Sequence, residues 1–152
     1  MPDSNLHARE ELLQSLRGPI DHLASALALL GEAYDHLDEQ QAQALETSLF
    51  KPLQRGYGRA KRAVREFAAR HEQPPPQLAE PAAPLPATGV KALVEGALAE
   101  VEEAENGIVT LQDSLVLLDL GDQELRARLA EVRQALGEAR GGARHFLRTL
   151  GR

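Results

Sequence analysis

Four runs of apolar residues, spaced mostly at alternating steps of three and four, constrain the fold of this chain more than any other feature. Such spacing places the apolar side chains on one face of an α-helix. The runs extend over residues 16–37, 45–67, 90–118 and 125–150. Leu, Ala, Glu, Gln and Arg dominate the sequence, whereas aromatic residues, which favour strands, make up only 3%. We therefore predict an all-α fold.

A proline-rich stretch separates these runs into two pairs. Six of the nine prolines lie within residues 74–86, where proline excludes helical geometry. The sequence therefore predicts a first helical hairpin at residues 1–71, an extended linker at 72–89 and a second hairpin at 90–152. Because a single hairpin leaves its apolar faces in water, we expect the two hairpins to pack as one antiparallel four-helix bundle. We interpret the linker as a spacer, and its three consecutive prolines are also a candidate ligand for a proline-binding module.

Polar breaks mark the tip of each predicted hairpin. The first break is at residues 38–40, and the second is at 120–123, where Gly121 can end one helix and Asp122 can cap the next. Between residues 90 and 118 the apolar spacing has no fault, so we predict one unbroken helix there. The two halves also share short similar segments, which leaves open whether they arose by duplication.

The composition excludes several classes of site and limits the partners. No cysteine is present, which excludes disulfides, thiolate zinc sites and cysteine nucleophiles. The formal net charge of −6 argues against general binding of nucleic acid. No apolar run approaches the roughly 20 residues of a membrane span, and the first residues do not resemble a signal peptide. We expect a cytoplasmic protein that has no cofactor and no membrane contact.

Charged residues are sorted by helix. Residues 95–124 carry nine acidic side chains and no Lys or Arg, whereas residues 51–70 carry seven basic side chains and one Glu. We interpret this sorting as ion pairing between neighbouring helices. An alternative is a docking face for an acidic partner or a nucleic acid. The candidate face is a basic stripe with cations at steps of three and four: Lys51, Arg55, Arg59, Arg62 and Arg65.

A Gly18-Pro19 pair interrupts the first predicted helix. A proline inside a helix removes one hydrogen bond and costs about 3 kcal/mol, so a bend there requires a reason. The segment from Leu16 to about Phe67 resembles the dimerisation and histidine-phosphotransfer domain of sensor histidine kinases. The resemblance rests above all on Leu16, Arg17 and Pro19.

Further matches to that family are a Leu-Leu pair at 29–30 and the turn at 34–40, which resembles the turn of the phytochrome-type members. In the family, two hairpins from two chains form one four-helix bundle, and a response regulator docks on its side. The resemblance therefore implies a bacterial protein that holds both hairpins in one chain. The family's phosphoacceptor histidine corresponds to Gln14 here, and a carboxamide has no nucleophilic ring nitrogen. The resemblance thus implies a protein that is not an enzyme.

Together these features predict a non-catalytic helical-bundle protein that docks a response regulator or a kinase. The expected docking residues are Gln14, Arg17, Pro19 and Ile20. A structural or oligomerising bundle, in which hairpins exchange between chains to form homo-oligomers, is the first alternative. Binding of an acidic partner or a nucleic acid through the basic stripe is the second.

Other residue patterns give no site. Glu32 and His36 share one helix face, but two ligands do not make a firm metal site. His22 lacks the local sequence of stand-alone histidine-phosphotransfer bundles. Gly56 and Gly58 superficially resemble a phosphate-binding loop, but they lie within an apolar helical run and no strand precedes them. We therefore expect no metal site and no nucleotide site.

Overall fold

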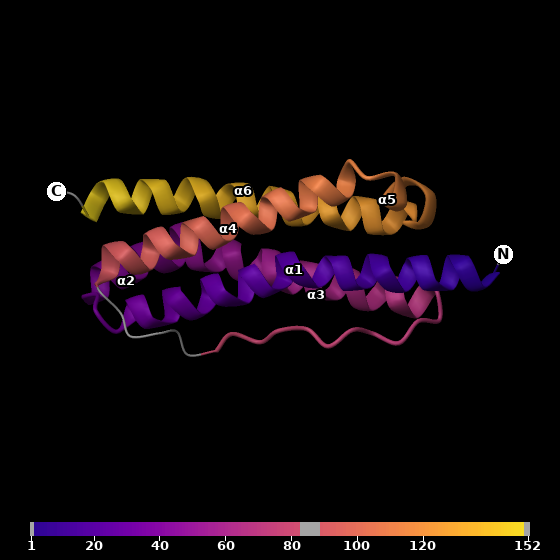
Figure 1. Cartoon of the computed structure of the whole chain (residues 1–152). Coiled ribbons are helices and arrows are strands. Elements are labelled where there is room, and N and C mark those ends of the chain that lie inside the picture. Colours follow the sequence, from indigo (N-terminus) through magenta and orange to yellow (C-terminus); the bar gives the residue numbers. More distant parts are fainter. Residues whose placement is uncertain (1, 83–88, 151–152) are drawn as a thin grey trace.

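The structure is a computed structural model that describes residues 2–82 and 89–150. Every regular element in these ranges is a helix, so the predicted all-α fold is confirmed. Figure 1 shows long helical segments lying side by side, with the two termini at opposite ends of the molecule. The elements, in chain order, are α1 (Pro2–Tyr34), α2 (Glu39–Leu45), the π-helical turn η1 (Glu46–Phe50), α3 (Lys51–Arg70), α4 (Val90–Gln112), α5 (Leu115–Leu120) and α6 (Gln123–Leu150).

The first turn joins α1 to a continuous rod made of α2, η1 and α3. Asp38 caps this rod, because its carboxylate accepts the amide of Gln41 at 2.8 Å and its own amide donates to the side chain of Gln41. Glu39, which the sequence places in the break, is already helical. The turn therefore lies at residues 35–38, slightly earlier than predicted, because the capping residue marks its end.

The second turn begins earlier than the sequence predicts, because α4 ends at Gln112. The hydroxyl of Ser114 donates to the carbonyl of Leu111 at 2.7 Å and accepts the amide of Leu117 at 3.2 Å, so it caps the short helix α5. The prediction of one unbroken helix to Leu118 is therefore wrong. A local side-chain bond has replaced the helical backbone bonds at this point.

The end of the second turn follows the prediction. Gly121 is the C-cap residue of α5, and its amide donates to the carbonyl of Leu117 at 2.9 Å. Asp122 accepts the amide of Leu125 at 2.7 Å at the start of α6. The side chains of Leu115 and Leu118, and the linker residues 83–88, lie outside the described part of the chain.

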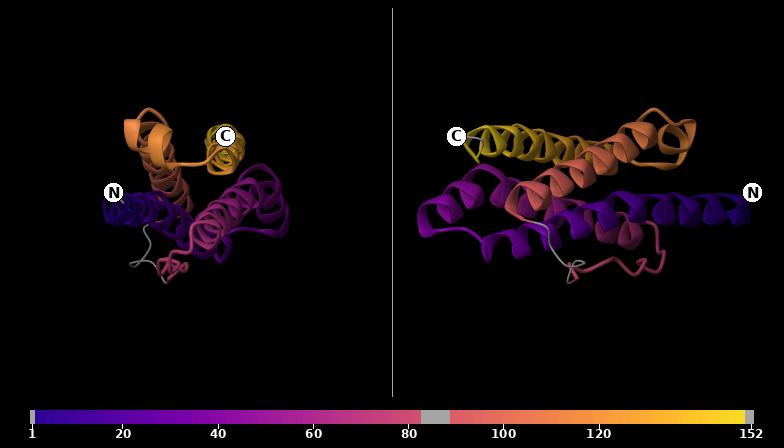
Figure 2. Two further views of the ribbon diagram at one scale, coloured as in Figure 1. Left: turned by 90° about the vertical axis from the view of Figure 1, so that its right-hand side faces the viewer. Right: turned by 60° about the vertical axis from the view of Figure 1, so that its left-hand side comes forward.

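The apolar runs predicted from the sequence form the core. Helix α1 makes its largest contact with α4, and α3 makes its largest contact with α6, while α4 also packs on α6 and α1 on α3. Figure 2 shows these segments surrounding a shared interior. The fully buried side chains come from all of them and include Leu23, Leu53, Phe67, Val101 and Leu136. The period of each helix therefore decides which residues reach the interior.

The chain that follows α3 is extended, and we call residues 73–82 the strap. Figures 1 and 2 show that the strap leaves the end of α3 and runs back along α1 and α3. The hydroxyl of Tyr57 in α3 donates to the carbonyl of Ala79 at 2.5 Å, and Lys61 Nζ lies 3.6 Å from the carboxylate of Glu80. The described part of the linker therefore runs lengthwise along the molecule.

The end of α3 is closed by a hydrogen-bonded cap in which Glu72 has a positive φ of 54°. The amide of Gln73 donates to the carbonyl of Ala68 at 2.8 Å, and the amide of Glu72 donates to the carbonyl of Ala69 at 3.3 Å. This pair of bonds is the Schellman motif. Glycine is the usual residue at this left-handed position, because a Cβ atom is strained there.

Replacing Glu72 with Gly is expected to raise the free energy of unfolding by about 0.5–1 kcal/mol, because it removes this strain. Urea denaturation followed by circular dichroism measures the change. Glu72→Ala is the matched control: it also removes the carboxylate but keeps the Cβ atom, so it should not stabilise the protein. Equal stabilisation by both substitutions would show that backbone strain is not the cause.

Candidate functional site

The four predicted docking residues lie on α1, but they do not form one exposed surface. Gln14 is exposed and Arg17 is half-buried, and Arg17 Nη1 donates to Gln14 Oε1 at 2.9 Å. Pro19 is buried, and Ile20 is only 1% exposed. Ile20 belongs to the apolar run of α1, so its side chain faces the core and cannot meet a partner. The exposed part of the predicted site is therefore the Gln14–Arg17 pair.

Pro19 lies inside α1, which continues through it as one helix. Helix α4 approaches the proline ring at Gly107, where a Cβ atom would lie only 3.0 Å from Pro19 Cγ. The missing side chain of Gly107 thus makes room for the ring, which gives Pro19 a packing role. A shallow depression beside this contact is lined by polar residues that include His22, Glu103 and Asn106.

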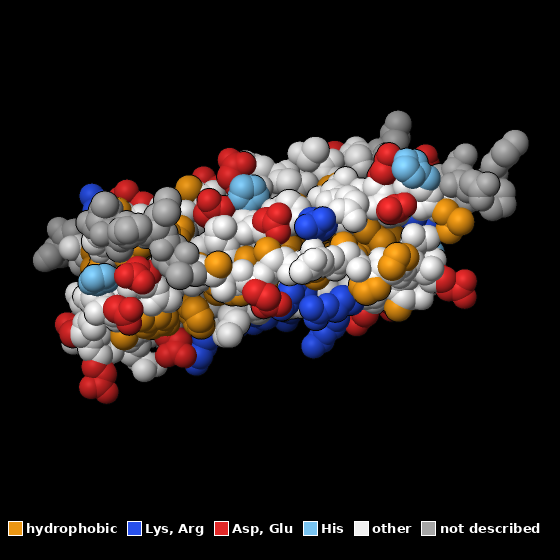
Figure 3. All heavy atoms as spheres, turned by 60° about the horizontal axis from the view of Figure 1, so that its bottom comes forward, with side chains coloured by type: hydrophobic (Ala, Val, Ile, Leu, Met, Phe, Trp, Pro, Cys, Tyr) orange, Lys and Arg blue, Asp and Glu red, His pale blue; other side chains and the backbone are white. Residues whose placement is uncertain are grey.

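The basic stripe lies on the side of α3 that faces away from the core. Its exposed members are Lys51, Arg55, Arg62 and Arg65, and Arg59 is half-buried. Among the described residues, only one of the five forms an ion pair: Arg55 Nη1 lies 2.9 Å from Glu138 of α6. Figure 3 shows a group of Lys and Arg side chains on the surface, in the lower middle of the view. The stripe therefore presents positive charge to solvent.

Acidic residues of α4 pair with arginines of α6. Arg140 Nη1 lies 2.9 Å from Glu105, and Arg144 Nη2 lies 3.7 Å from Glu102. Only 12% of the Glu105 side chain is exposed. Burial raises the pKa of Glu105 above its ordinary value, although the charge of Arg140 opposes this change. These pairs join the acidic helix α4 to α6. Of the basic residues 51–70, only Arg70 pairs with the acidic stretch in the described part of the chain, through Asp122 and Glu124.

A cluster of polar side chains surrounds Asp122 in the second turn. Its carboxylate accepts Arg70 Nε at 2.7 Å and Arg70 Nη2 at 2.9 Å, lies 2.9 Å from His71 Nε2, and caps α6 through the amide of Leu125. Burial alone would raise the pKa of Asp122, but hydrogen bonds from Arg70, Leu125 and His71 hold this pKa far below its ordinary value. Arg70 also donates to Glu124 at 2.9 Å. The carboxylate is thus fully engaged, which suits a structural clamp between α3 and α6.

Sequence reasoning found only part of this cluster. The spacing within the turn predicted the cap by Asp122, because capping is a local interaction. It did not predict Arg70 or His71 as partners, which lie about fifty positions earlier in the chain. The only signal in the sequence was the pair of acidic residues at the turn, Asp122 and Glu124, which indicates that cations from a neighbouring helix bind there.

His22, His36 and Gly56, which the sequence analysis singled out, have structural contacts, whereas a Cβ atom at Gly58 would meet nothing within 4 Å. His22 Nδ1 lies 2.6 Å from Glu100 of α4, and His36 Nε2 lies 3.9 Å from Glu32. In the part of the chain that the structure describes, no group of three His, Asp or Glu side chains could hold a metal ion. Gly56 lies within α3, where a Cβ atom would meet Leu136 of α6 at 2.9 Å, so it serves helix packing.

No helix within residues 2–82 and 89–150 is both long enough and apolar enough to cross a membrane. Comparison with protein-family models, with curated proteins and with solved structures found no match to this chain.

Proposed function

We propose that this protein is a non-catalytic helical bundle that acts by docking a partner protein. In this proposal the scaffold is an antiparallel four-helix bundle made of two hairpins, one formed by α1 with the α2–η1–α3 rod and the other by α4 with α6. The capped turns after α1 and before α6 support this arrangement, as do the contacts of α1 with α4 and of α3 with α6. Such a scaffold presents the outer sides of its helices as rigid surfaces.

The observation that carries the proposal is the Gln14–Arg17 pair on α1. Arg17 is oriented by its hydrogen bond to Gln14, and the pair occupies the position at which the resemblance to sensor histidine kinases places the phosphoacceptor. An oriented guanidinium binds carboxylate and phosphate groups with two parallel hydrogen bonds. A receiver domain or a kinase, as the resemblance implies, is therefore the partner class that we propose. The amide of Gln14 would allow binding without phosphotransfer.

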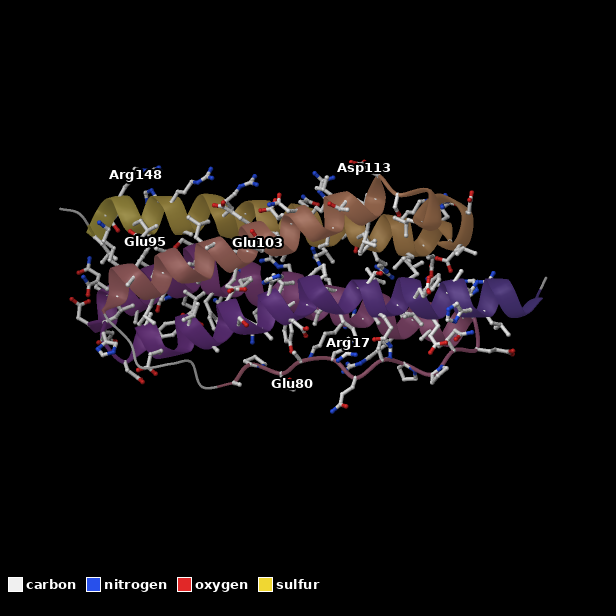
Figure 4. All side chains as sticks on the ribbon, viewed as in Figure 1. Arg17, Glu80, Glu95, Glu103, Asp113 and Arg148 are labelled. Carbon is white, nitrogen blue, oxygen red and sulfur yellow. The ribbon has the colours of Figure 1, made fainter. Side chains whose placement is uncertain are left out.

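The test is affinity capture of the tagged full-length chain from its own host, followed by measurement of Kd with the purified partner. Arg17→Glu is expected to weaken binding at least tenfold, because the introduced carboxylate repels the acidic groups of the partner that the guanidinium would bind. The matched control is Arg148→Glu on α6, which is exposed on another side of the molecule (Figure 4) and should leave Kd unchanged.

Two results would overturn the assignment of the surface. If Arg17→Glu binds as tightly as the wild type, the Gln14–Arg17 pair is not the docking site. If Arg62→Glu abolishes binding while Arg17→Glu does not, the docking surface is the basic stripe of α3, and affinity should then fall steeply with salt.

A further inference from the structure

The strap touches the rest of the protein with a regular subset of its residues. Gln73, Pro76 and Ala79, which are three positions apart, are half-buried, and so is Leu78. The other strap residues are exposed, namely Pro74, Pro75, Gln77, Glu80, Pro81 and Ala82. A polyproline II helix has three residues per turn, so residues three apart lie along one edge. Between Gln73 and Ala79 this spacing places one edge of the strap against the helices, with Leu78 as an additional contact.

Two side chains of α3 hold the middle of the strap. Tyr57 donates its hydroxyl to the carbonyl of Ala79, and the Lys61 ammonium lies 4.5 Å from the centre of the Tyr57 ring and 3.6 Å from the Glu80 carboxylate. Burial, together with the nearby charge of Glu80, raises the pKa of Tyr57, so its hydroxyl remains a donor. Proteins recognise proline-rich peptides through surfaces lined by aromatic side chains, and Tyr57 supplies one aromatic ring at this position.

The contacts that hold the strap are few. Apart from the Gln73 amide, which closes the end of α3, the contacts given by the described residues are one hydrogen bond to a backbone carbonyl, one ion pair in which 69% of the Glu80 side chain is exposed, and the packing of Leu78 and Ala79 on the core. Exposed ion pairs contribute little to stability. Continuity of the chain, rather than strong binding, therefore keeps the strap in place.

We propose that the strap-facing side of α3, centred on Tyr57 and Lys61, is a binding site for an extended proline-rich peptide that carries an acidic residue after its prolines. The strap is the resident ligand of this site, and a partner with a segment of the same chemistry binds by displacing it. A short tether gives the strap an effective concentration in the millimolar range, so a partner segment displaces it only by binding the site more tightly than the strap does. This inference is independent of docking at Gln14 and Arg17. Figure 4 shows Glu80 and Arg17 on the same side of the molecule, where the strap runs.

The experiment empties the site and then offers the ligand in trans. In the full-length chain, residues 74–82 are replaced by the same number of Gly and Ser residues, which can span the same distance because a flexible chain extends to about 3.3–3.6 Å per residue. A synthetic peptide of residues 72–82 is then added up to several millimolar, and the amide NMR signals of α3 are followed. Saturable shifts are expected around Tyr57 and Lys61 in this variant, with at least tenfold weaker binding to the wild type.

Matched variants separate this site from unspecific binding. Tyr57→Phe keeps the ring in the core and removes the hydroxyl, so it should weaken peptide binding about fivefold. A peptide in which Ala replaces the three prolines at 74–76 should bind more weakly, because it loses the preformed extended conformation. Absence of binding to the strap-replaced chain, with its helical content retained, would overturn the proposal. Equal binding to the wild type would also overturn it, because the strap would then not occupy the site.

Discussion

Replacing Gly142 with Ala is expected to lower the free energy of unfolding by about 3 kcal/mol or more. The added methyl group would clash with backbone atoms, which cannot move aside as a flexible side chain can. A Cβ atom at this position of α6 would overlap the carbonyl oxygen of Ser48 in η1 and lie 2.5 Å from its carbonyl carbon. The backbones of the two elements therefore touch directly. Relief would require α6 and η1 to separate along the bundle.

The neighbouring glycine provides a matched control. Gly141 is exposed, and a Cβ atom there would meet nothing within 4 Å. Gly141→Ala should therefore raise stability by about 0.5–1 kcal/mol, since glycine weakens a helix interior relative to alanine. Urea denaturation of both variants, followed by far-UV circular dichroism, measures the contrast. If the two alanine variants had the same stability, the close contact between α6 and η1 would not exist in solution.

The close approach at Gly142 depends on the irregular backbone of η1. Pro52 has no amide hydrogen, so the regular helical bond to the carbonyl of Ser48, four residues earlier, cannot form. Just before it the helix widens, and the amide of Lys51 donates to the carbonyl of Glu46, five residues back. The Ser48 carbonyl is therefore the point of η1 that α6 can approach most closely. Only a residue without a Cβ atom fits there, so α6 has a glycine at position 142.

Apolar spacing predicted which residues form the core, because that property depends only on the helical period. Ile20 illustrates its reliability. The resemblance to a kinase domain placed Ile20 in a docking surface, whereas its position in the apolar run placed it in the interior, where it is 1% exposed. The helical period predicted the position of Ile20 correctly, because burying an apolar side chain is favourable and the period determines which side chains can be buried. The resemblance rests on a few residues and contains no such physical constraint.

The features that sequence reasoning missed depend on local competition or on distant partners. Ser114 breaks the predicted third helix because its hydroxyl offers the backbone an alternative bond, and the apolar pattern continues unchanged across the break. The glycines at 107 and 142 matter because of what α1 and η1 place opposite them. The pairing of Arg70 with Asp122 joins residues that only the fold brings together.

The second large effect is expected at Asp122, whose replacement by Ala should cost about 2–3 kcal/mol at neutral pH. The substitution removes the cap of α6, which contributes about 1 kcal/mol, and the charge-assisted hydrogen bonds from Arg70, which contribute about 1.5 kcal/mol or more. Asp122→Asn separates the two parts, because an amide can still cap a helix but carries no charge. Its expected cost is about half as large. Asp113→Asn is the matched control: Asp113 is exposed at the end of α4, with no ion pair among the described residues, so its cost should stay under about 0.5 kcal/mol.

The loss caused by Asp122→Asn should also depend on pH. The pKa of Asp122 is depressed in the folded state, so the unfolded chain binds its proton first as the pH falls. The stabilisation is therefore complete above the ordinary aspartate pKa of about 3.9 and is lost as the pH falls from there toward the depressed value. Urea denaturation of the wild type and of Asp122→Asn should give a larger difference at pH 5 than near pH 3. A difference that stays the same down to pH 3 would mean that Asp122 holds α3 and α6 together by geometry alone, with no contribution from its charge.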